Sequence, residues 1–123
     1  MFDIFIKTHF SAGHHLRNYP GNCEHPHGHN WSVKVTVRAN KLDELGMGLD
    51  FRTLKNSVNK VMDDLDHRNL NEHPAFETIN PSSENIAVYI FDTVKDELST
   101  DNYQLHSVMV GETDNTGITY FGS

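Results

Sequence analysis

The chain has little cysteine, little basic charge and no long apolar run. Its single cysteine, Cys23, cannot form a disulfide within the chain, so a reducing compartment, by default the cytoplasm, is expected. Ten basic residues against seventeen acidic ones give a net charge of −7, which argues against nucleic-acid and anionic-membrane partners. No apolar run reaches membrane-spanning length, and no leader precedes the first predicted strand. The sequence predicts a soluble cytoplasmic protein.

Length and composition predict a single domain spanning residues 1–123. With 37% apolar and 22% charged residues, the chain can bury one ordinary core and is too short for two. Period-two alternation predicts four strands, and helical spacing of apolar residues predicts two helices between the second and third strands. The strands cover about 2–14, 27–39, 103–113 and 118–121, and the helices cover about 51–65 and 82–98. Asp50 is expected to cap the first helix, and Ser82, Ser83 and Glu84 are interpreted as capping residues of the second. The apolar face of the first helix is predicted to consist of Phe51, Leu54, Val58, Val61, Met62 and Leu65.

This order of elements favours an α+β fold over a doubly wound parallel sheet. Strands and helices are segregated along the chain, which is typical of an antiparallel sheet with both helices packed on one face. The other face of such a sheet needs polar cover or another subunit, so self-association is expected.

Three histidines fall on the apolar side of the first two strands. His27 and His29 are separated by one residue, so their imidazoles point to the same side of an extended chain. Parity places His14, rather than His15, on the apolar side of the first strand, where it can meet them across a hairpin. Inward imidazoles need a proton partner or a metal, and three neutral nitrogens with an open fourth position are typical of catalytic zinc.

Cys23 leaves the character of this site open. It lies in a turn-rich loop four positions before His27, and as a fourth ligand it would make the zinc site structural. Nine histidines in so short a chain also make chance proximity an alternative to metal binding. The histidines interpreted as surface or locally bonded residues are His9, His15, His25, His73 and His106.

Two further groups are candidates for chemistry. Glu112 shares strand parity with Val108 and Val110, so its carboxylate is predicted to point toward the apolar side, where it needs hydrogen-bond donors. Asp66 and His67 lie where the first helix is expected to end. From their position alone, this pair is interpreted as helix-end residues that bond to the following loop.

A series of motifs runs the length of the chain in one order. The motifs are Phe10-x-Ala12-x-His14-x-Leu16, Cys23 with three intervening residues before His27-Gly28-His29, Asp50-Phe51, Leu65-Asp66-His67 with Leu70-Asn71, Asn80-Pro81-Ser82-Ser83-Glu84, and Glu112-Thr113. Together they closely resemble the family of 6-pyruvoyl-tetrahydropterin and 6-carboxy-tetrahydropterin synthases.

This resemblance implies the tunnelling fold, in which four-stranded antiparallel sheets from several subunits form an oligomeric barrel with paired helices outside. It also implies a zinc-dependent lyase that acts on a dihydropterin triphosphate at active sites between subunits. The implied roles are Zn²⁺ ligation by His14, His27 and His29, general base catalysis by Cys23, proton transfer by Asp66 and His67 toward a neighbouring subunit's site, and pterin anchoring by Glu112.

The spacing before the histidine pair bears on the product. The short gap from Cys23 to His27 resembles the bacterial 6-carboxy-tetrahydropterin synthases, whereas the animal-type pyruvoyl enzymes have a longer gap. The 6-carboxy branch converts 7,8-dihydroneopterin triphosphate to 6-carboxy-5,6,7,8-tetrahydropterin, with loss of triphosphate and acetaldehyde, on the route to queuosine and other 7-deazaguanines.

Three alternatives to that branch remain at the level of sequence, and the first is the 6-pyruvoyl product. Glu24, as an alternative acid or base, resembles the variant that cleaves the side chain to 6-hydroxymethyl-dihydropterin for folate synthesis, although it is also interpretable as a solvated loop residue. The alternative from another class is a non-catalytic, zinc-stabilised module that binds a pterin without converting it.

Overall fold

Two long strands pair along their whole length because alternation is strong in both. β1 (Phe2–His14) and β2 (His27–Ala39) are antiparallel, and the register runs from Phe2 opposite Ala39 to His14 opposite His27. The computed structural model describes residues 1–18 and 27–123. Both strands have the predicted bounds, and their ends bring the histidines of the sequence motif to one end of the sheet.

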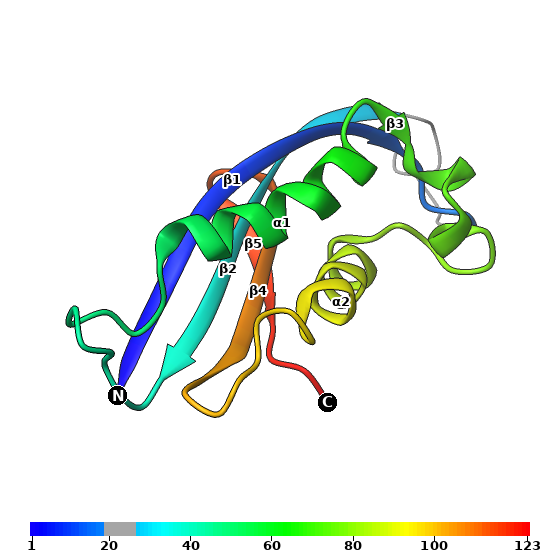
Figure 1. Cartoon of the computed structure of the whole chain (residues 1–123). Helices are drawn as coiled ribbons and strands as arrows, with labels where there is room; N and C mark the ends of the chain where they lie inside the picture. The colour runs from blue at the N-terminus through cyan, green and yellow to red at the C-terminus, as the bar shows by residue number, and fades with distance from the viewer. Residues whose placement is uncertain (19–26) are drawn as a thin grey trace.

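The described residues form a five-stranded sheet with the order β3-β1-β2-β4-β5 (Figure 1). β4 (Tyr103–Thr113) pairs antiparallel with β2, and β5 (Thr116–Tyr120) pairs antiparallel with β4. β3 (Arg68–Asn69) pairs parallel with β1, which makes the sheet mixed. The sequence predicted a four-stranded antiparallel sheet and missed β3, because a two-residue strand is too short to show any periodicity.

Two helices cover one face of the sheet (Figure 1). α1 (Phe51–Leu65) begins at Asp50, whose side chain accepts a hydrogen bond from the backbone N–H of Arg52. This capping was predicted, and it satisfies an N–H that has no partner within the helix. Of the predicted apolar face, only Phe51 is exposed, at 58%. The buried residues of α1 are Leu54, Ser57, Val58, Val61, Met62 and Leu65.

α2 (Ser83–Val94) begins in the same way, at Ser82, whose hydroxyl accepts from the N–H of Asn85 at 3.1 Å. The sequence had indicated this serine as a capping residue. Two short 3₁₀ helices, Leu70–Glu72 and Pro74–Phe76, lie between α1 and α2. α1 packs on β1, and α2 packs on β4 and β5.

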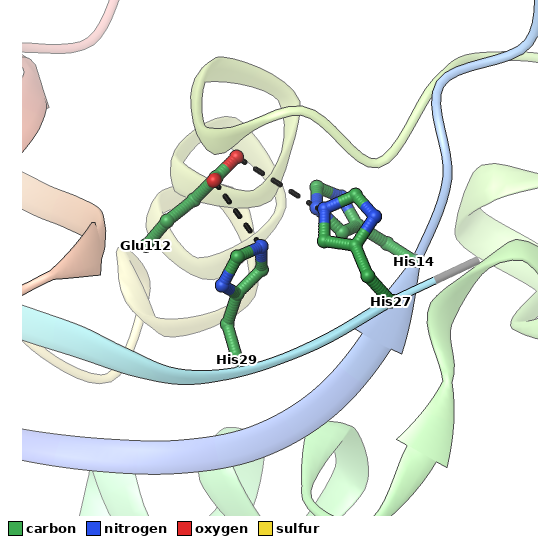
Figure 2. Close-up of side chains that lie close together, drawn as sticks. All are labelled: His14, His27, His29 and Glu112. Carbon is green, nitrogen blue, oxygen red and sulfur yellow. Dashed lines mark hydrogen bonds and ion pairs between the residues drawn. The ribbon is translucent and has the colours of Figure 1, made fainter. Parts of the chain in front are cut away.

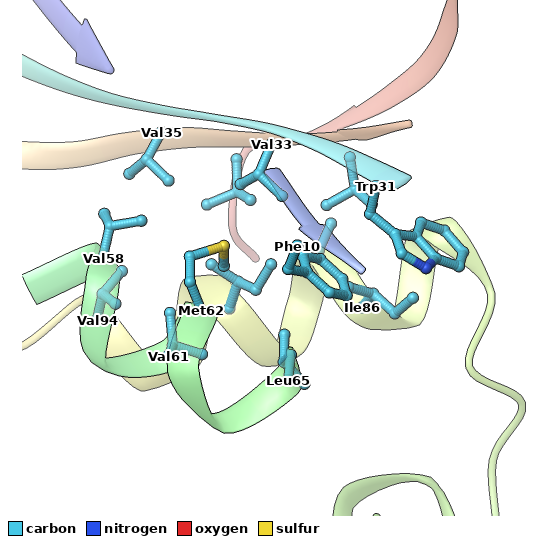
Figure 3. Close-up of a cluster of buried hydrophobic side chains, with 14 of the residues drawn as sticks. Phe10, Trp31, Val33, Val35, Val58, Val61, Met62, Leu65, Ile86 and Val94 are labelled. Carbon is cyan, nitrogen blue, oxygen red and sulfur yellow. The ribbon is translucent and has the colours of Figure 1, made fainter. Parts of the chain in front are cut away.

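The core lies between the helices and the sheet (Figure 3). Trp31, Val33 and Val35 of β2 are fully buried there against the apolar faces of both helices. Burying each such side chain stabilises the fold by roughly 1.5–3 kcal/mol. In the described part of the chain, no helix is both long and apolar enough to span a membrane.

The opposite face of the sheet carries no helix from the described residues (Figure 1). Polar residues alternate with the core residues there, and Lys7 lies directly opposite Lys34 across β1 and β2. Like charges in directly opposite positions repel. One of these ammonium groups, that of Lys34, lies 4.3 Å from the ring centroid of Phe5.

Asp64 connects three elements of the helical layer. Its Oδ2 accepts hydrogen bonds from His73 Nε2 at 2.8 Å and from the Tyr89 hydroxyl at 2.6 Å. The other ring nitrogen of His73 accepts from the N–H of Ala75, so Nε2 carries the proton. Burial raises the pKa of Asp64, but the hydrogen bonds from Tyr89 and His73 outweigh burial and leave that pKa below its usual value.

We expect Asp64→Asn to lower the free energy of unfolding at pH 7 by roughly 1–3 kcal/mol, since hydrogen bonds to a charged group are lost. A carboxyl group with a depressed pKa in the folded state stabilises the fold above its unfolded pKa, near 3.8, and this contribution is lost as the pH falls further. The difference between the parent and Asp64→Asn should therefore shrink below about pH 4. Urea unfolding of the chelator-treated parent and variant at pH 7 and pH 3 measures this difference in the free energy of unfolding. An equal difference at both pH values would contradict the lowered pKa of Asp64.

Candidate metal centre

The three histidines of the sequence motif lie together at the end of the β1–β2 pair. His14 is the last residue of β1 and stands opposite His27, the first residue of β2. His29 follows two residues later and stands opposite Ala12. Because side chains alternate along a strand, all three imidazoles lie on the face of the sheet that carries the helices. The predicted shared face is confirmed.

A carboxylate from β4 completes the group. Glu112 and the three imidazoles point toward one another in Figure 2, and one ligand atom from each of the four residues lies within 4.8 Å of the others. His14 Nε2 lies 3.0 Å from His27 Nε2 and 3.7 Å from Glu112 Oε1. His29 Nε2 lies 3.2 Å from Glu112 Oε2. The sequence placed Glu112 on the correct face, but not among the histidines.

Burial favours the neutral, metal-binding form of His14 and His29. It lowers the pKa of His14, and the positive form of the neighbouring His27 would lower it further, against the effect of a hydrogen bond to the Pro81 carbonyl. Burial also lowers the pKa of His29, and Glu112 opposes that shift. His14 and His29 therefore resist protonation at a pH just below the usual imidazole pKa, which keeps a nitrogen lone pair on each ring available for a metal.

The geometry of the four donors fits a small metal ion. Two ligands of a tetrahedral zinc ion, each about 2.0–2.1 Å from the metal, lie about 3.3 Å from each other. The 3.0, 3.2 and 3.7 Å separations between donors are close to that value. His29 Nε2 is buried and makes no hydrogen bond of acceptable geometry, although Glu112 is near. Three nitrogens and one carboxylate oxygen form a donor set that a divalent cation satisfies.

Trp31 supports the centre from within the core. Its ring is fully buried and meets the rings of His14 and His29 edge to face, with centroids 4.8 and 5.3 Å away. Its indole N–H donates to the carbonyl of Ala12 at 3.2 Å, which fixes the ring on β1. The large, fixed indole ring of Trp31 restricts the rotamers of both imidazoles and so holds their nitrogens in place.

Asp66 and His67 lie outside this group of four. Asp66 ends α1, and its Oδ1 accepts from the N–H of Ser11 at 2.8 Å, which is the main cause of its lowered pKa. Its Oδ2 pairs with His67 Nδ1 at 2.8 Å. The His67 N–H donates to the Ser11 carbonyl, and His67 has a φ of 58°, a left-handed backbone conformation that is costly for a residue with a Cβ.

The imidazole of His67 is 82% exposed and lines a pocket of about 410 Å³. The other residues of this pocket come mostly from the ends of β1 and β2. They are Ser11, Ala12, Gly13, Gly28, His29, Asn30 and Arg68. Because His29 is among them, the pocket reaches one histidine of the group of four.

The remaining residues predicted for the site are Cys23 and Glu24, which lie outside the described residues. Of the histidines interpreted as locally bonded, His9 pairs with Asp114 at 3.1 Å, and buried His73 pairs with Asp64. Across residues 1–18 and 27–123, neither of these belongs to a group suited to metal binding.

A family model described as 6-pyruvoyl tetrahydropterin synthase matches residues 3–123. The chain belongs to this family. The resemblance inferred from the motifs is thereby confirmed over almost the full length of the chain.

Curated relatives in the 6-pyruvoyl tetrahydropterin synthase family have two kinds of name. "6-Carboxy-5,6,7,8-tetrahydropterin synthase" of Rickettsia typhi is 33% identical over 86% of this chain and 90% of its own length, and that of Synechocystis is 36% identical over 98% and 94%. Human "6-pyruvoyl tetrahydrobiopterin synthase" is 38% identical over 83% of this chain and 72% of its own length.

A solved structure from the same family confirms the fold. The structure of Caenorhabditis elegans 6-pyruvoyl tetrahydropterin synthase has a TM-score of 0.88 and 33% identity, and the match covers 99% of this chain and 96% of that one. This tetrahydropterin synthase family member therefore shares the fold of its relative.

Sequence reasoning missed two supporting groups in this family member. Trp31 has the same strand parity as His27 and His29, so its contact with the metal centre was available from the alternation alone. The Pro81 carbonyl, which accepts a hydrogen bond from His14 Nδ1 at 2.8 Å, gave no such signal, because a backbone group 67 positions away leaves no pattern in the sequence.

Proposed function

We propose that the chain is a cytoplasmic zinc enzyme that converts 7,8-dihydroneopterin triphosphate to 6-carboxy-5,6,7,8-tetrahydropterin, with loss of triphosphate and acetaldehyde, in queuosine biosynthesis. The observation that carries this proposal is the convergence of His14, His27, His29 and Glu112 in a member of the 6-pyruvoyl tetrahydropterin synthase family. Three imidazoles leave a coordination position for substrate, as catalytic zinc sites do.

One observation favours the 6-carboxy branch over the 6-pyruvoyl branch, namely the short spacing between Cys23 and His27. Length favours neither branch, because the chain covers 94% of the Synechocystis 6-carboxy relative and 96% of the Caenorhabditis elegans 6-pyruvoyl structure. Identity to the Rickettsia, Synechocystis and human relatives is similar and favours neither branch.

Within the site, each residue has a distinct role. Zinc held by His14, His27 and His29 would polarise the side-chain hydroxyls of the substrate as a Lewis acid. Cys23 would take the proton from the carbon chain, since a thiol close to a dication ionises readily. Glu112 would turn from the histidines to the pterin, whose amino and ring N–H groups offer two parallel donors to one carboxylate.

Asp66 and His67 would complete the site of a neighbouring subunit. The carboxylate accepts from His67 Nδ1, which orients the ring and stabilises its protonated form during proton transfer. The pocket that His67 lines also includes His29, but the His67 imidazole is 82% exposed and lies outside the group of four donors, so it is available to a neighbouring subunit. We infer an oligomeric barrel of single-domain subunits, in which the uncovered sheet face lines the interior and each active site lies at an interface.

Two other activities compete with this one. The 6-pyruvoyl product would arise at the same zinc site, and Glu24 favours cleavage to 6-hydroxymethyl-dihydropterin. The non-enzymatic alternative is a zinc-stabilised pterin-binding module, in which the donors shape a binding site and Cys23 has no role in turnover.

Mass identification of the product distinguishes these functions. Incubating the zinc-loaded protein with dihydroneopterin triphosphate is expected to yield 6-carboxy-tetrahydropterin and acetaldehyde in equal amounts. A pyruvoyl product alone would contradict the branch assignment, and a hydroxymethyl product would support the role of Glu24. Unchanged substrate, recovered bound to a folded zinc protein, would support the binding module instead.

A further inference from the structure

A backbone carbonyl sets the tautomer of the neutral His14 ring. His14 Nδ1 lies 2.8 Å from the carbonyl oxygen of Pro81, and because a carbonyl only accepts hydrogen bonds, Nδ1 is the donor. In the neutral ring, the proton on Nδ1 leaves the lone pair on Nε2, the nitrogen that faces His27 and Glu112. The ring is 1% exposed, so water does not compete for this bond.

Asn80 is the residue before Pro81, and its hydrogen bonds hold this part of the backbone in place. Its Oδ1 accepts from the backbone N–H of Arg17 at 2.9 Å, and its Nδ2 donates to the carbonyl of Arg17 at 3.2 Å. The backbone carbonyl of Asn80 accepts from Asn85 Nδ2 at 2.8 Å, in the first turn of α2. The peptide that carries Pro81 is therefore fixed both to the chain that follows β1 and to α2.

The guanidinium of Arg17 fixes the rest of the segment. It donates to the carbonyls of Ile79, Asn71 and Phe76 at 3.0, 3.1 and 2.8 Å. One planar fork thus gathers three backbone carbonyls that are spread over nine positions of the chain. Over residues 1–18 and 27–123, Arg17 forms no ion pair with a carboxylate, so its hydrogen bonds go to backbone rather than to an acidic partner.

A second asparagine repeats the bridge on the other side of His14. Asn71 Oδ1 accepts from the backbone N–H of His15 at 2.9 Å, and Asn71 Nδ2 donates to the His15 carbonyl at 3.1 Å. The residue next to His14 and the residue next to Pro81 are therefore each held by two-point amide bonds. Both ends of the hydrogen bond between His14 and Pro81 are anchored.

We propose that Arg17, Asn71 and Asn80 are positioning residues that fix the metal-binding tautomer of His14 through the Pro81 carbonyl. The inference rests on the proposed role of His14 as a zinc ligand. Hydrogen-bond partners behind a ligating histidine orient its ring and raise its basicity, and their removal typically weakens metal binding by about 10–100-fold. Arg17 in this view serves the metal centre and is not a ligand for the substrate triphosphate.

Zinc affinity, measured by competition with a chromophoric chelator, tests the proposal without substrate. Asn80→Ala removes both amide bonds, and Arg17→Lys replaces the fork with a single ammonium. Both should weaken zinc binding by about 10–100-fold. Asn80→Asp keeps the acceptor for the Arg17 N–H and should lose less. Arg38→Lys is the matched control, because Arg38 makes a surface ion pair with Asp3 at the other end of β2. This variant should bind zinc as tightly as the parent.

The tautomer is followed in the same proteins by nitrogen NMR of labelled histidine. The zinc-loaded parent should show a His14 ring proton on Nδ1 that exchanges slowly with water, and Asn80→Ala should exchange it faster. Where Asn80→Ala fails to fold by circular dichroism, Asn80→Asp and Arg17→Lys decide the question. Folded variants with parental zinc affinity overturn the proposal, and so does an Arg17→Lys effect confined to the KM for the triphosphate substrate. A parent chain that binds no zinc overturns the proposed function as well.

Discussion

Cys23→Ala should lower kcat by roughly 10²–10⁴-fold, the usual contribution of a general base, while zinc content and oligomer size stay at parental values. The reason is that the three proposed ligands, His14, His27 and His29, lie in one cluster and hold the metal without the thiol. The alanine variant removes the proton acceptor and leaves the polarising metal in place. Steady-state kinetics with dihydroneopterin triphosphate, and zinc analysis of the same samples, measure the two effects separately.

Cys23→Ser is the matched control for this result. The hydroxyl keeps nearly the size of the thiol but ionises far less readily, so this variant should be as slow as Cys23→Ala and should also retain zinc. Loss of zinc together with unfolding in either variant would show that Cys23 is a fourth ligand. The site would then be structural, and the catalytic assignment would fail.

Mixing two inactive variants should restore activity. His27→Ala damages the metal centre and keeps Asp66 and His67, whereas His67→Ala damages the proton-transfer pair and keeps the metal centre. If each active site takes its metal from one subunit and His67 from the next, random mixing rebuilds about a quarter of the sites with both halves intact. Turnover by refolded mixtures should therefore rise from near zero to about a quarter of the parental rate.

The control mixture combines His27→Ala with Cys23→Ala. Both changes fall in the same half of the proposed site, so no combination of these subunits forms an intact one, and activity should stay near zero. Formation of mixed oligomers is verified with a mass tag on one variant. Mixed oligomers of His27→Ala and His67→Ala that show no recovery would mean that His67 serves the metal centre of its own subunit.

The sequence predicted the metal-centre histidines because strand alternation reports which face a side chain occupies. His14, His27 and His29 all lie on the predicted face, and His14 stands opposite His27 as expected for a hairpin. The helix that begins at Asp50 and the serine cap of α2 were also predicted, because capping depends on residues only a few positions apart. Local patterns thus located the centre and the helices above it.

What the sequence left out depends on contacts between distant segments. β3 consists of two residues and exists only because Arg68 and Asn69 lie beside Ala12 and Gly13. The approach of Glu112 to the histidines depends on the β2–β4 register, which its strand parity did not specify. The hydrogen bond between His14 and the Pro81 carbonyl also joins distant segments, and residue types in the sequence do not indicate which backbone carbonyl a side chain will contact.

Zinc content and turnover, followed together in one preparation, test the central claim that three imidazoles hold a metal required for the reaction. Removing the metal with a chelator should abolish conversion of dihydroneopterin triphosphate, and adding zinc should restore it in proportion to the zinc bound, up to one ion per chain. His14→Ala, His27→Ala and His29→Ala should each fail to recover zinc or activity. Parental turnover by the metal-free chain, or full zinc binding by these three variants, would contradict the account.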